Sequence, residues 1–384
     1  MSMKKGIAIL GATGSVGLKA LNIVEAYPDR FDLQVITANK NADLLISQAL
    51  HHKPNTVVIA DESQYKKVRE ALCNEDVHVY AGIDALCQVL ESGEIHTVVN
   101  GIHGFSGLRP TIAAIKSRKQ IALANKESLV AAGELVTTLA KEHGVNIYPI
   151  GSVHSSIFQC LVGEFHNTIE KVFLTTSGGP FNGMTLDQLS RVGNKDFSLI
   201  DGQLLSKKEV DCATLIQSVF ELIEARWLFN VVPEKIDLIV HKQSLIHGMV
   251  QFEDGSMKAQ MGQRDLKFPI QFSLTYPERL TAHSARFNFM DYPELNFEKP
   301  NRHVFQSIDL AYSAMEKGGT AACILNAAND VAVAAFLKGQ IRFIEISKIN
   351  KATLESCEVK LKASYEDYLN ADSISREHAL NLLK

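Results

Sequence analysis

The chain begins with a short apolar run that leads directly into a loop of three evenly spaced glycines. Residues 6–10 (Gly-Ile-Ala-Ile-Leu) have the composition of a buried parallel strand, and a helical pattern follows the loop. In this setting Gly11 permits a tight turn, Gly14 leaves room for a pyrophosphate, and Gly17 lets the helix pack closely on the strand. Gly11–Gly17 therefore predicts a dinucleotide-binding loop, with a plain tight turn as the alternative. The other loop residues expected to contact the cofactor are Thr13, Ser15 and Val16.

The end of the second predicted strand indicates which dinucleotide is bound. The strand at 33–37 is followed by Ala38-Asn39-Lys40-Asn41. A site for NAD usually has an acid at this point, which binds the ribose hydroxyls. Because the segment has no acid and one cation, it would accept a 2′-phosphate, and we expect NADPH with contacts from Asn39 and Lys40. The alternative is that Lys40 is a solvated surface residue without a ligand.

Apolar runs and helical patterns alternate as far as residue 149. Repeated strand–helix units predict an α/β fold with a parallel sheet, and we assign residues 1–150 to a Rossmann-like domain. The pattern then changes, and 151–285 is expected to be a central α+β domain. A linker at 286–312 and a C-terminal helical bundle at 313–384 complete the chain. The strands expected in the central domain are 171–176, 235–240, 247–252 and 257–261.

Composition excludes several classes of protein. The formal net charge is −4 and no block of Lys or Arg stands out, which argues against nucleic-acid binding. The six cysteines are scattered without a CxxC pair, as expected for reduced thiols and not for disulfides or a zinc site. The sequence has no uninterrupted apolar segment of about 18 residues, the length that a membrane span needs. We therefore expect a soluble, cytoplasmic protein that binds a small-molecule substrate.

Seven segments together resemble one protein family. They are Gly11–Gly17, Thr37–Leu45, Leu123–Val130, Thr176–Phe181, Ile223–Phe229, His241–His247 and Leu325–Asn329. In these segments, and in their order over nearly the whole chain, the sequence is similar to 1-deoxy-D-xylulose 5-phosphate reductoisomerase, an enzyme of non-mevalonate isoprenoid synthesis. The resemblance implies an NADPH domain, a catalytic domain with a lid at about 193–209, a C-terminal helical domain and a homodimer.

The resemblance also implies a reaction and the residues that perform it. The family rearranges the carbon skeleton of a ketose phosphate and reduces the resulting aldehyde with NADPH, while Mg²⁺ or Mn²⁺ polarises the carbonyl. Carried over to this chain, it implies cofactor contacts from Asn125 and Glu127. It implies catalytic roles for Lys126, His154 and His247. The alternatives are a loop salt bridge between Lys126 and Glu127 and structural roles for the two histidines.

The implied metal site departs from the family's pattern. The family reads Pro-Val-Asp-Ser-Glu-His where this chain reads Pro-Ile-Gly-Ser-Val-His, so Gly151 and Val153 replace two metal-binding carboxylates. Glu221 retains the third carboxylate, and Ser152 retains a hydroxyl that would contact substrate. One carboxylate and one hydroxyl make a poor site for a hard divalent cation, which needs several oxygen ligands. We therefore expect metal binding to be weak or absent.

The implied phosphate site and lid differ as well. The family's Ser, Asn and Lys correspond to Cys212, Gln217 and Ser218, while Ser177 is a retained hydroxyl. The lid lacks the family's His-Pro-x-Trp signature. Candidate replacements are Phe197 for the Trp and Lys207 or Lys208 for the phosphate-binding charge. Cys212 could act as a nucleophile near a helix start, although an inert buried thiol is the simpler interpretation.

These departures leave three hypotheses about function. The favoured one is an NADPH-dependent oxidoreductase that acts, without the usual metal, on deoxyxylulose phosphate or on an altered and unphosphorylated carbonyl substrate. The second is a catalytically inactive paralogue with a binding or regulatory role. The third is an ordinary reductoisomerase in which other residues supply the missing ligands.

Overall fold

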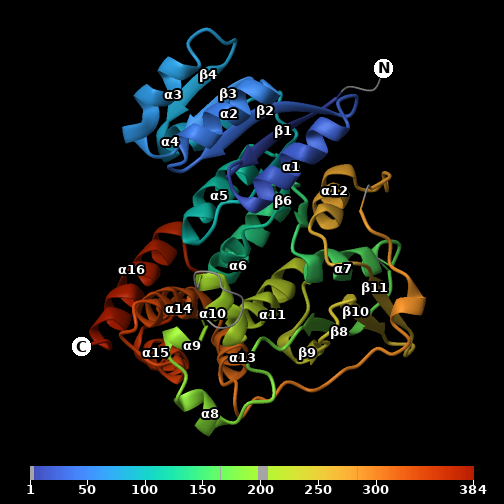
Figure 1. Ribbon diagram of the computed structural model, residues 1–384, viewed down its shortest axis with the longest axis vertical. Coiled ribbons are helices and arrows are strands. Elements are labelled where there is room, and N and C mark those ends of the chain that lie inside the picture. The colour runs from blue at the N-terminus through green and yellow to red at the C-terminus, as the bar shows by residue number, and fades with distance from the viewer. Residues whose placement is uncertain (1–3, 165, 198–205, 283) are drawn as a thin grey trace. The chain divides into compact units, whose positions relative to one another are not determined.

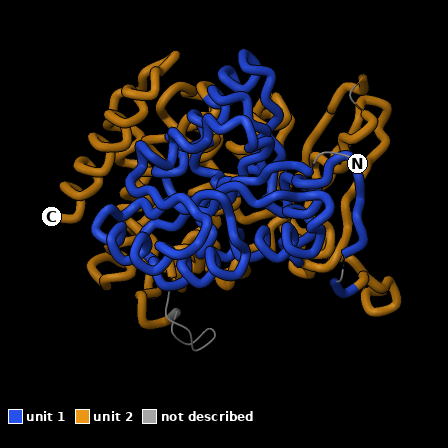
Figure 2. The backbone as a smooth tube through the Cα atoms, turned by 90° about the horizontal axis from the view of Figure 1, so that it is seen from above, with its two compact units in different colours: residues 1–128, 136–155, 265–285 blue, residues 129–135, 156–264, 286–384 orange. Residues whose placement is uncertain are grey.

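The chain forms two compact units in the computed structural model, which describes residues 4–164, 166–197, 206–282 and 284–384. Unit 1 consists of residues 1–128, 136–155 and 265–285, and unit 2 consists of residues 129–135, 156–264 and 286–384. Figure 2 distinguishes the two units by colour. Each unit is assembled from three separate stretches of the chain.

A seven-stranded parallel sheet forms the centre of unit 1 (Figure 1). The order β4-β3-β2-β1-β5-β6-β7 places the first strand in the middle, where Ile7, Ile9 and Leu10 are fully buried. Strands covered on both faces are typical of parallel sheets, and the predicted Rossmann-like fold is confirmed. The strands are β1 (Lys5–Leu10), β2 (Phe31–Ala38), β3 (Thr56–Ile59), β4 (His78–Ala81), β5 (Thr97–Asn100), β6 (Gln120–Leu123) and β7 (Ile147–Pro149).

Helices alternate with these strands, as the sequence predicts. Their apolar residues, such as Leu21 of α1 and Leu45 of α2, are buried in the same core as the sheet. The helices are α1 (Ser15–Ala26), α2 (Ala42–His52), α3 (Tyr65–Ala71), α4 (Gly82–Val89), α5 (Leu108–Lys116) and α6 (Lys126–His143).

A segment from much later in the chain completes unit 1. Helix α12 (Lys267–Thr275) packs against α1, β6 and β7, and its Ile270 and Leu274 belong to the core of the sheet. Lys5 Nζ also donates a hydrogen bond to the Leu274 carbonyl oxygen at 2.9 Å. The sequence places residues 265–285 at the end of the central domain, 151–285. Burial of the apolar face of α12 gathers them into unit 1 instead.

A four-stranded mixed sheet lies in unit 2, in the order β11-β10-β8-β9. β10 is antiparallel to β8 and β11, whereas β8 and β9 are parallel. The strands are β8 (Ile169–Thr176), β9 (Ile236–Val240), β10 (Ile246–Phe252) and β11 (Met257–Met261). Helices before and between these strands give the predicted α+β pattern; they are α7 (Ser152–Leu161), α8 (Leu186–Ser190), α9 (Asn194–Phe197), α10 (Lys207–Ala213) and α11 (Ile216–Phe229).

The C-terminal part of unit 2 is helical, as predicted. Helix α14 packs against both α15 and α16 (Figure 1), and the ring centroids of Phe336 and Phe343 are 6.1 Å apart. The helices are α13 (Ser307–Lys317), α14 (Ala321–Leu337), α15 (Phe343–Ser356) and α16 (Tyr365–Asn381). None of the helices described here or above combines the length and hydropathy that a bilayer crossing requires.

A buried polar network joins α10 to the C-terminal helices. The buried Asp211 carboxylate accepts hydrogen bonds from Lys207 Nζ at 2.5 Å and from Asn329 Nδ2 at 2.9 Å. Lys207 Nζ also lies 3.3 Å from Asp330, which pairs with Arg376 of α16 at 2.8 Å. Burial lowers the pKa of Lys207, but the charges of Asp211 and Asp330 outweigh this effect and raise it. The start of α10 is thereby fixed to α14 and α16.

We expect Phe336→Ala to lower the free energy of unfolding of unit 2 by about 3–5 kcal/mol, because it removes a fully buried ring from the last turn of α14. The matched control Leu380→Ala removes an exposed side chain and should change it by no more than about 0.5 kcal/mol. Urea unfolding followed by tryptophan fluorescence measures the free energy of unfolding of both variants, because the single tryptophan, Trp227, lies in unit 2. Equal effects would contradict the packing described for α14.

Candidate active site

The glycine loop at the carboxyl end of β1 has two positions at which glycine is required. Gly11 has a φ of +78°, a conformation that other residues rarely adopt. At Gly17 a Cβ atom would collide with the Gly11 carbonyl oxygen and would lie 2.5 Å from Ala12 Cα. Gly14 has more space, since a Cβ there would lie 3.3 Å from the Gly11 carbonyl oxygen. The close approach of α1 to β1 therefore depends mainly on Gly17.

The first turn of α1 has the form that a pyrophosphate requires. Gly14 is the N-cap residue and supplies no side-chain cap, so the first N–H groups of the helix are left for a ligand. A helix start carries a partial positive charge that favours bound phosphate. Thr13 and Val16 are half-buried and Ser15 is exposed around this turn. These residues fit a dinucleotide.

Thr37 and Gln48, two polar residues, hold the glycine loop by hydrogen bonds to its backbone. Thr37 of β2 accepts a hydrogen bond from the Gly11 N–H through Oγ1 at 3.0 Å and one from the Ala12 N–H through its carbonyl oxygen at 2.7 Å. The buried Gln48 of α2 donates to the Ala12 carbonyl oxygen at 2.9 Å. Sequence reasoning missed both roles, because a single polar residue within an apolar segment has no characteristic spacing.

Asn39 and Lys40 follow β2 and are both exposed. The structure adds an acid that the sequence does not connect with them. Asp61 follows β3, and its backbone N–H donates to the Asn39 carbonyl oxygen at 3.0 Å. Hydrogen bonds from Ser63 lower the pKa of Asp61, and the charge of Lys40 makes a smaller contribution. A 2′-phosphate at Lys40 would therefore have a carboxylate as a neighbour.

Asn125 is the N-cap residue of α6, and the structure commits its side chain to protein groups. Its Nδ2 donates to the carbonyl oxygens of Ile102 and Gly104 at 2.7 and 2.9 Å, and to Glu127 Oε2 at 3.0 Å. Asn125 is buried, while Lys126 and Glu127 are half-buried. Asn125 therefore orients Glu127 and the turn at 102–104.

The stretch that follows β7 places Gly151 before α7 and Ser152, Val153 and His154 in its first turn. The side chains of Val153 and His154 are buried, with 8% and 1% of their surface exposed, and Ser152 is half-buried. A Cβ at Gly151 would meet His154 Nδ1 at 3.4 Å, an ordinary van der Waals contact, so the backbone leaves room for a side chain there. The stretch offers no carboxylate, and its donor set does not fit Mg²⁺ or Mn²⁺.

In unit 2 the structure brings together the predicted phosphate-contacting residues. Cys212 Sγ donates to Gln217 Oε1 at 3.1 Å, and Gln217 Nε2 donates to Glu221 Oε1 at 3.3 Å. Ser218 Oγ donates to Thr176 Oγ1 at 3.0 Å, next to the exposed Ser177. The four side chains predicted to contact phosphate are all uncharged, and Gln217 connects this group to the carboxylate of Glu221.

The expected lid, about 193–209, lies partly outside the described residues. Residues 198–205 and the side chain of Phe197 are not described. Of the two lysines considered as phosphate ligands, Lys207 is bound by Asp211 and Asp330. Lys208 is exposed. The positive charge of Lys207 is therefore already balanced by two carboxylates.

His247 is at the start of β10 in unit 2 and is half-buried. Burial lowers the pKa of this histidine, and the charges of Arg264 and His241 lower it further. Hydrogen bonds with the backbone of Gly262 and Gln263 act in the opposite direction. The neutral imidazole is therefore favoured, which suits a hydrogen-bonding group better than a fixed cation.

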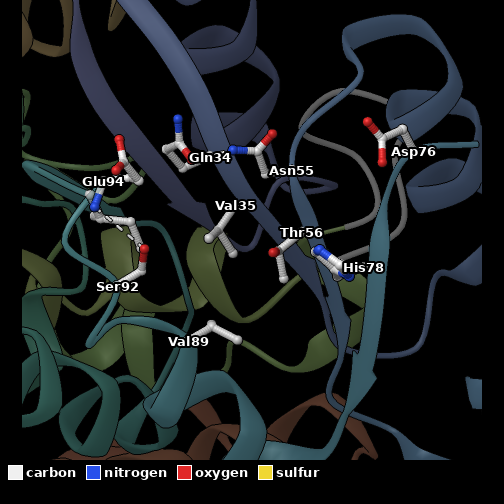
Figure 3. Close-up of a pocket in the computed structure, with 10 residues that line it drawn as sticks. Gln34, Val35, Asn55, Thr56, Asp76, His78, Val89, Ser92 and Glu94 are labelled. Carbon is white, nitrogen blue, oxygen red and sulfur yellow. Dashed lines mark hydrogen bonds between the residues drawn. The ribbon is translucent and has the colours of Figure 1, made fainter.

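A cavity of about 330 Å³ opens at the other edge of the parallel sheet (Figure 3). It is lined by residues at the amino ends of β3, β4 and β5, including Asn55, Thr56, Asp76, His78 and Glu94. The glycine loop is at the carboxyl edge, where open parallel sheets bind their ligands. This cavity is therefore separate from the candidate site.

A parallel sheet whose central strand leads through a glycine loop into α1 places the chain in the class of doubly wound, Rossmann-like α/β proteins. Three family models match it. The model described as 1-deoxy-D-xylulose 5-phosphate reductoisomerase covers residues 7–133, and two models of C-terminal domains of the same enzyme cover 147–229 and 261–378. The chain belongs to the 1-deoxy-D-xylulose 5-phosphate reductoisomerase family, as the resemblance indicated.

Full-length relatives agree with this assignment. The chain is 46% identical to a 1-deoxy-D-xylulose 5-phosphate reductoisomerase of Bacteroides thetaiotaomicron, over 99% of this chain and 98% of the relative. It superimposes on the Zymomonas mobilis reductoisomerase in complex with NADPH with a TM-score of 0.95, at 36% identity over 100% of both chains. A reductoisomerase in complex with magnesium gives a TM-score of 0.91, at 33% identity over 99% of this chain and 98% of the other.

We expect His247 to make the stability of the protein depend on pH. Its pKa in the folded state lies below the ordinary value of 6.5, so the unfolded chain binds the proton more readily. The free energy of unfolding should therefore fall as the pH drops below 6.5 and continue to fall towards the lowered pKa. Urea unfolding at about pH 7.5 and about pH 5.5 should show a smaller loss in His247→Gln than in the unchanged protein. The exposed His303→Gln serves as control and should keep the full loss.

Proposed function

We propose that this chain binds NADPH and reduces a carbonyl compound, with little or none of the metal-dependent rearrangement of deoxyxylulose phosphate. The observation that carries the proposal is a contrast within unit 1. The glycine loop has the close packing that a dinucleotide requires, whereas Gly151 and Val153 occupy the positions of two implied metal ligands. The relatives named as reductoisomerases, one of them solved with NADPH, support the oxidoreductase class.

The cofactor would be held by the loop Gly11–Gly17 and by Asn39 and Lys40. The uncapped start of α1 would bind the pyrophosphate, and the ammonium group of Lys40 would bind the 2′-phosphate. Glu127, oriented by Asn125, is the further residue proposed to contact the cofactor. When bound, NADPH supplies the hydride for reduction of a carbonyl group.

The protein side of the reaction would depend on Lys126 and two histidines. Carbonyl reduction leaves an oxygen that needs a proton, and the Lys126 ammonium is the proposed donor. His154 is buried in the first turn of α7 and would orient a substrate oxygen. His247 favours its neutral form and would act as a hydrogen-bonding partner. Ser152 is the hydroxyl proposed to contact the same substrate.

The substrate that best fits this chain is uncharged where the family's substrate carries phosphate. Phosphate binding normally relies on cationic side chains and charge-assisted hydrogen bonds. Here Ser177, Cys212, Gln217 and Ser218 are neutral. The carboxylate of the neighbouring Glu221 would repel a phosphate. Glu221 is the only one of the three implied metal ligands that is still a carboxylate. An unphosphorylated hydroxyketone or hydroxyaldehyde is therefore the proposed substrate class.

The second candidate is an inactive paralogue that works by binding. The hydrogen bonds from Cys212 through Gln217 to Glu221 favour this candidate, because side chains that bond to one another have fewer hydrogen bonds to offer a substrate. In either case we expect a cytoplasmic homodimer that binds neither nucleic acid nor membrane. The loss of NADPH absorbance in the presence of hydroxyketones or hydroxyaldehydes distinguishes the two proposals, because an inactive paralogue would not consume NADPH.

Binding of NADPH provides the first test. We expect NADPH to raise the melting temperature of the protein more than NADH does, because only NADPH has a 2′-phosphate that Lys40 can bind. Lys40→Ala should weaken NADPH binding by about 1.5–3 kcal/mol, the range for a charged hydrogen bond, and leave NADH binding nearly unchanged. The control Lys66→Ala removes an exposed charge from α3 and should change neither. Equal shifts by both dinucleotides would contradict the assignment of Lys40.

Restoring the two missing carboxylates provides a second test. We expect Mg²⁺ to raise the melting temperature of the double variant Gly151→Asp with Val153→Glu but not that of the unchanged protein. The backbone at Gly151 has room for the new side chain, since a Cβ there makes only an ordinary contact with His154. The matched control is Gly151→Asn with Val153→Gln, which has the same shape without the charges.

Turnover of deoxyxylulose phosphate completes this test. The unchanged protein should show no reductoisomerase activity with Mg²⁺ or Mn²⁺. Ordinary turnover would refute the proposal in favour of an active reductoisomerase with other metal ligands. Mg²⁺ stabilisation of the unchanged protein, or of the amide control, would equally show that Gly151 and Val153 do not limit metal binding.

A further inference from the structure

Three side chains at the carboxyl-terminal ends of α1 and α2 form a separate cluster in unit 1. Glu25 is in the last turn of α1, and His51 and His52 are the last two residues of α2. His51 Nε2 lies 3.0 Å from Glu25 Oε1, and His52 Nδ1 lies 3.9 Å from Glu25 Oε2. In the described part of the chain, this is the one group of three or more His, Cys, Asp or Glu side chains whose ligand atoms all lie within 4.8 Å of one another.

The spacing of these atoms suits a small transition-metal ion. Zinc binds imidazole nitrogen and carboxylate oxygen at about 2.0–2.2 Å with tetrahedral angles, which separates neighbouring ligand atoms by about 3.3 Å. The distance from His51 to Glu25 Oε1, at present a hydrogen bond of 3.0 Å, and the distance of 3.9 Å from His52 to Glu25 Oε2 lie on either side of that value. Two imidazoles and one carboxylate are donors that zinc prefers, whereas Mg²⁺ and Ca²⁺ prefer oxygen ligands throughout.

The surroundings also favour a cation. Both histidines are in the last turn of α2, where the helix dipole presents its negative end. The side chain of His52 is 13% exposed, so its ring lies on the protein side of the cluster. The side chains of His51 and Glu25 are 63% and 52% exposed, which leaves the site open to an ion and to water.

We propose that Glu25, His51 and His52 bind one Zn²⁺ ion, with water completing the coordination. The site is distinct from the candidate active site, because the glycine loop is at the opposite end of α1. Glu25 is ten positions after Ser15 in this helix, a distance of about 15 Å along its axis. An ion at this position joins the ends of α1 and α2 and takes no part in carbonyl reduction.

Calorimetric titration of the tag-free protein with ZnCl₂ tests this site without any need for a cofactor. We expect one ion per chain. Glu25→Gln and His51→Ala should each lower the association constant for Zn²⁺ by about tenfold or more. Loss of a residue that only hydrogen-bonds to a metal ligand already has an effect of that size. The control His303→Ala removes an exposed histidine elsewhere and should leave the constant unchanged. Absence of binding, or equal binding by all variants, for example at the exposed Cys73, would overturn the proposal.

Two further measurements show whether the site is formed as described. Bound Co²⁺ should give the intense visible spectrum of tetrahedral coordination in the unchanged protein and lose it in both ligand variants, whose melting temperatures without metal should stay near that of the unchanged protein. Zn²⁺ should raise the melting temperature of the unchanged protein alone. An octahedral Co²⁺ spectrum, or a Zn²⁺-dependent rise in Glu25→Gln, would refute the assignment.

Discussion

The contact between Gly17 and the turn at Gly11–Ala12 is the constraint on which the structure of unit 1 depends. Without a side chain at Gly17, the first turn of α1 can pack directly on the backbone that leaves β1. β1 is in turn the central strand of the sheet, bonded to β2 and β5. The same close approach directs the first N–H groups of α1 to the edge of the sheet where ligands bind. One packing requirement thus accounts for both the core and the anion-binding end of the helix.

Sequence reasoning succeeds where a structural role has a local signature. The apolar, β-branched strands and the glycine loop are of this kind, and they lead to the correct fold. It fails where the role depends on residues far apart in the chain. The position of α12 in unit 1 and the contact of Asp211 with Asn329 have no such signature. Asp61 near Lys40 is missed for the same reason, since adjacent strands bring together segments that the chain separates.

The two units offer different electrostatic environments to a ligand. The start of α1 provides N–H groups for a negatively charged ligand, whereas the hydrogen bonds in α11 end on the carboxylate of Glu221. In unit 2 the thiol of Cys212 donates a hydrogen bond to Gln217, so two predicted phosphate contacts bind each other.

The discontinuous make-up of the two units has a consequence for the protein during its synthesis. Ile270 and Leu274 belong to the core of a sheet that begins at Lys5, so this core is complete only after α12 has been synthesised. Asp330, which also pairs with Lys207, acquires its second partner only after Arg376 has been synthesised. During synthesis both units therefore lack contacts that late segments provide. Chaperones or a slower rate of translation would favour correct folding in this period, when apolar surfaces are exposed.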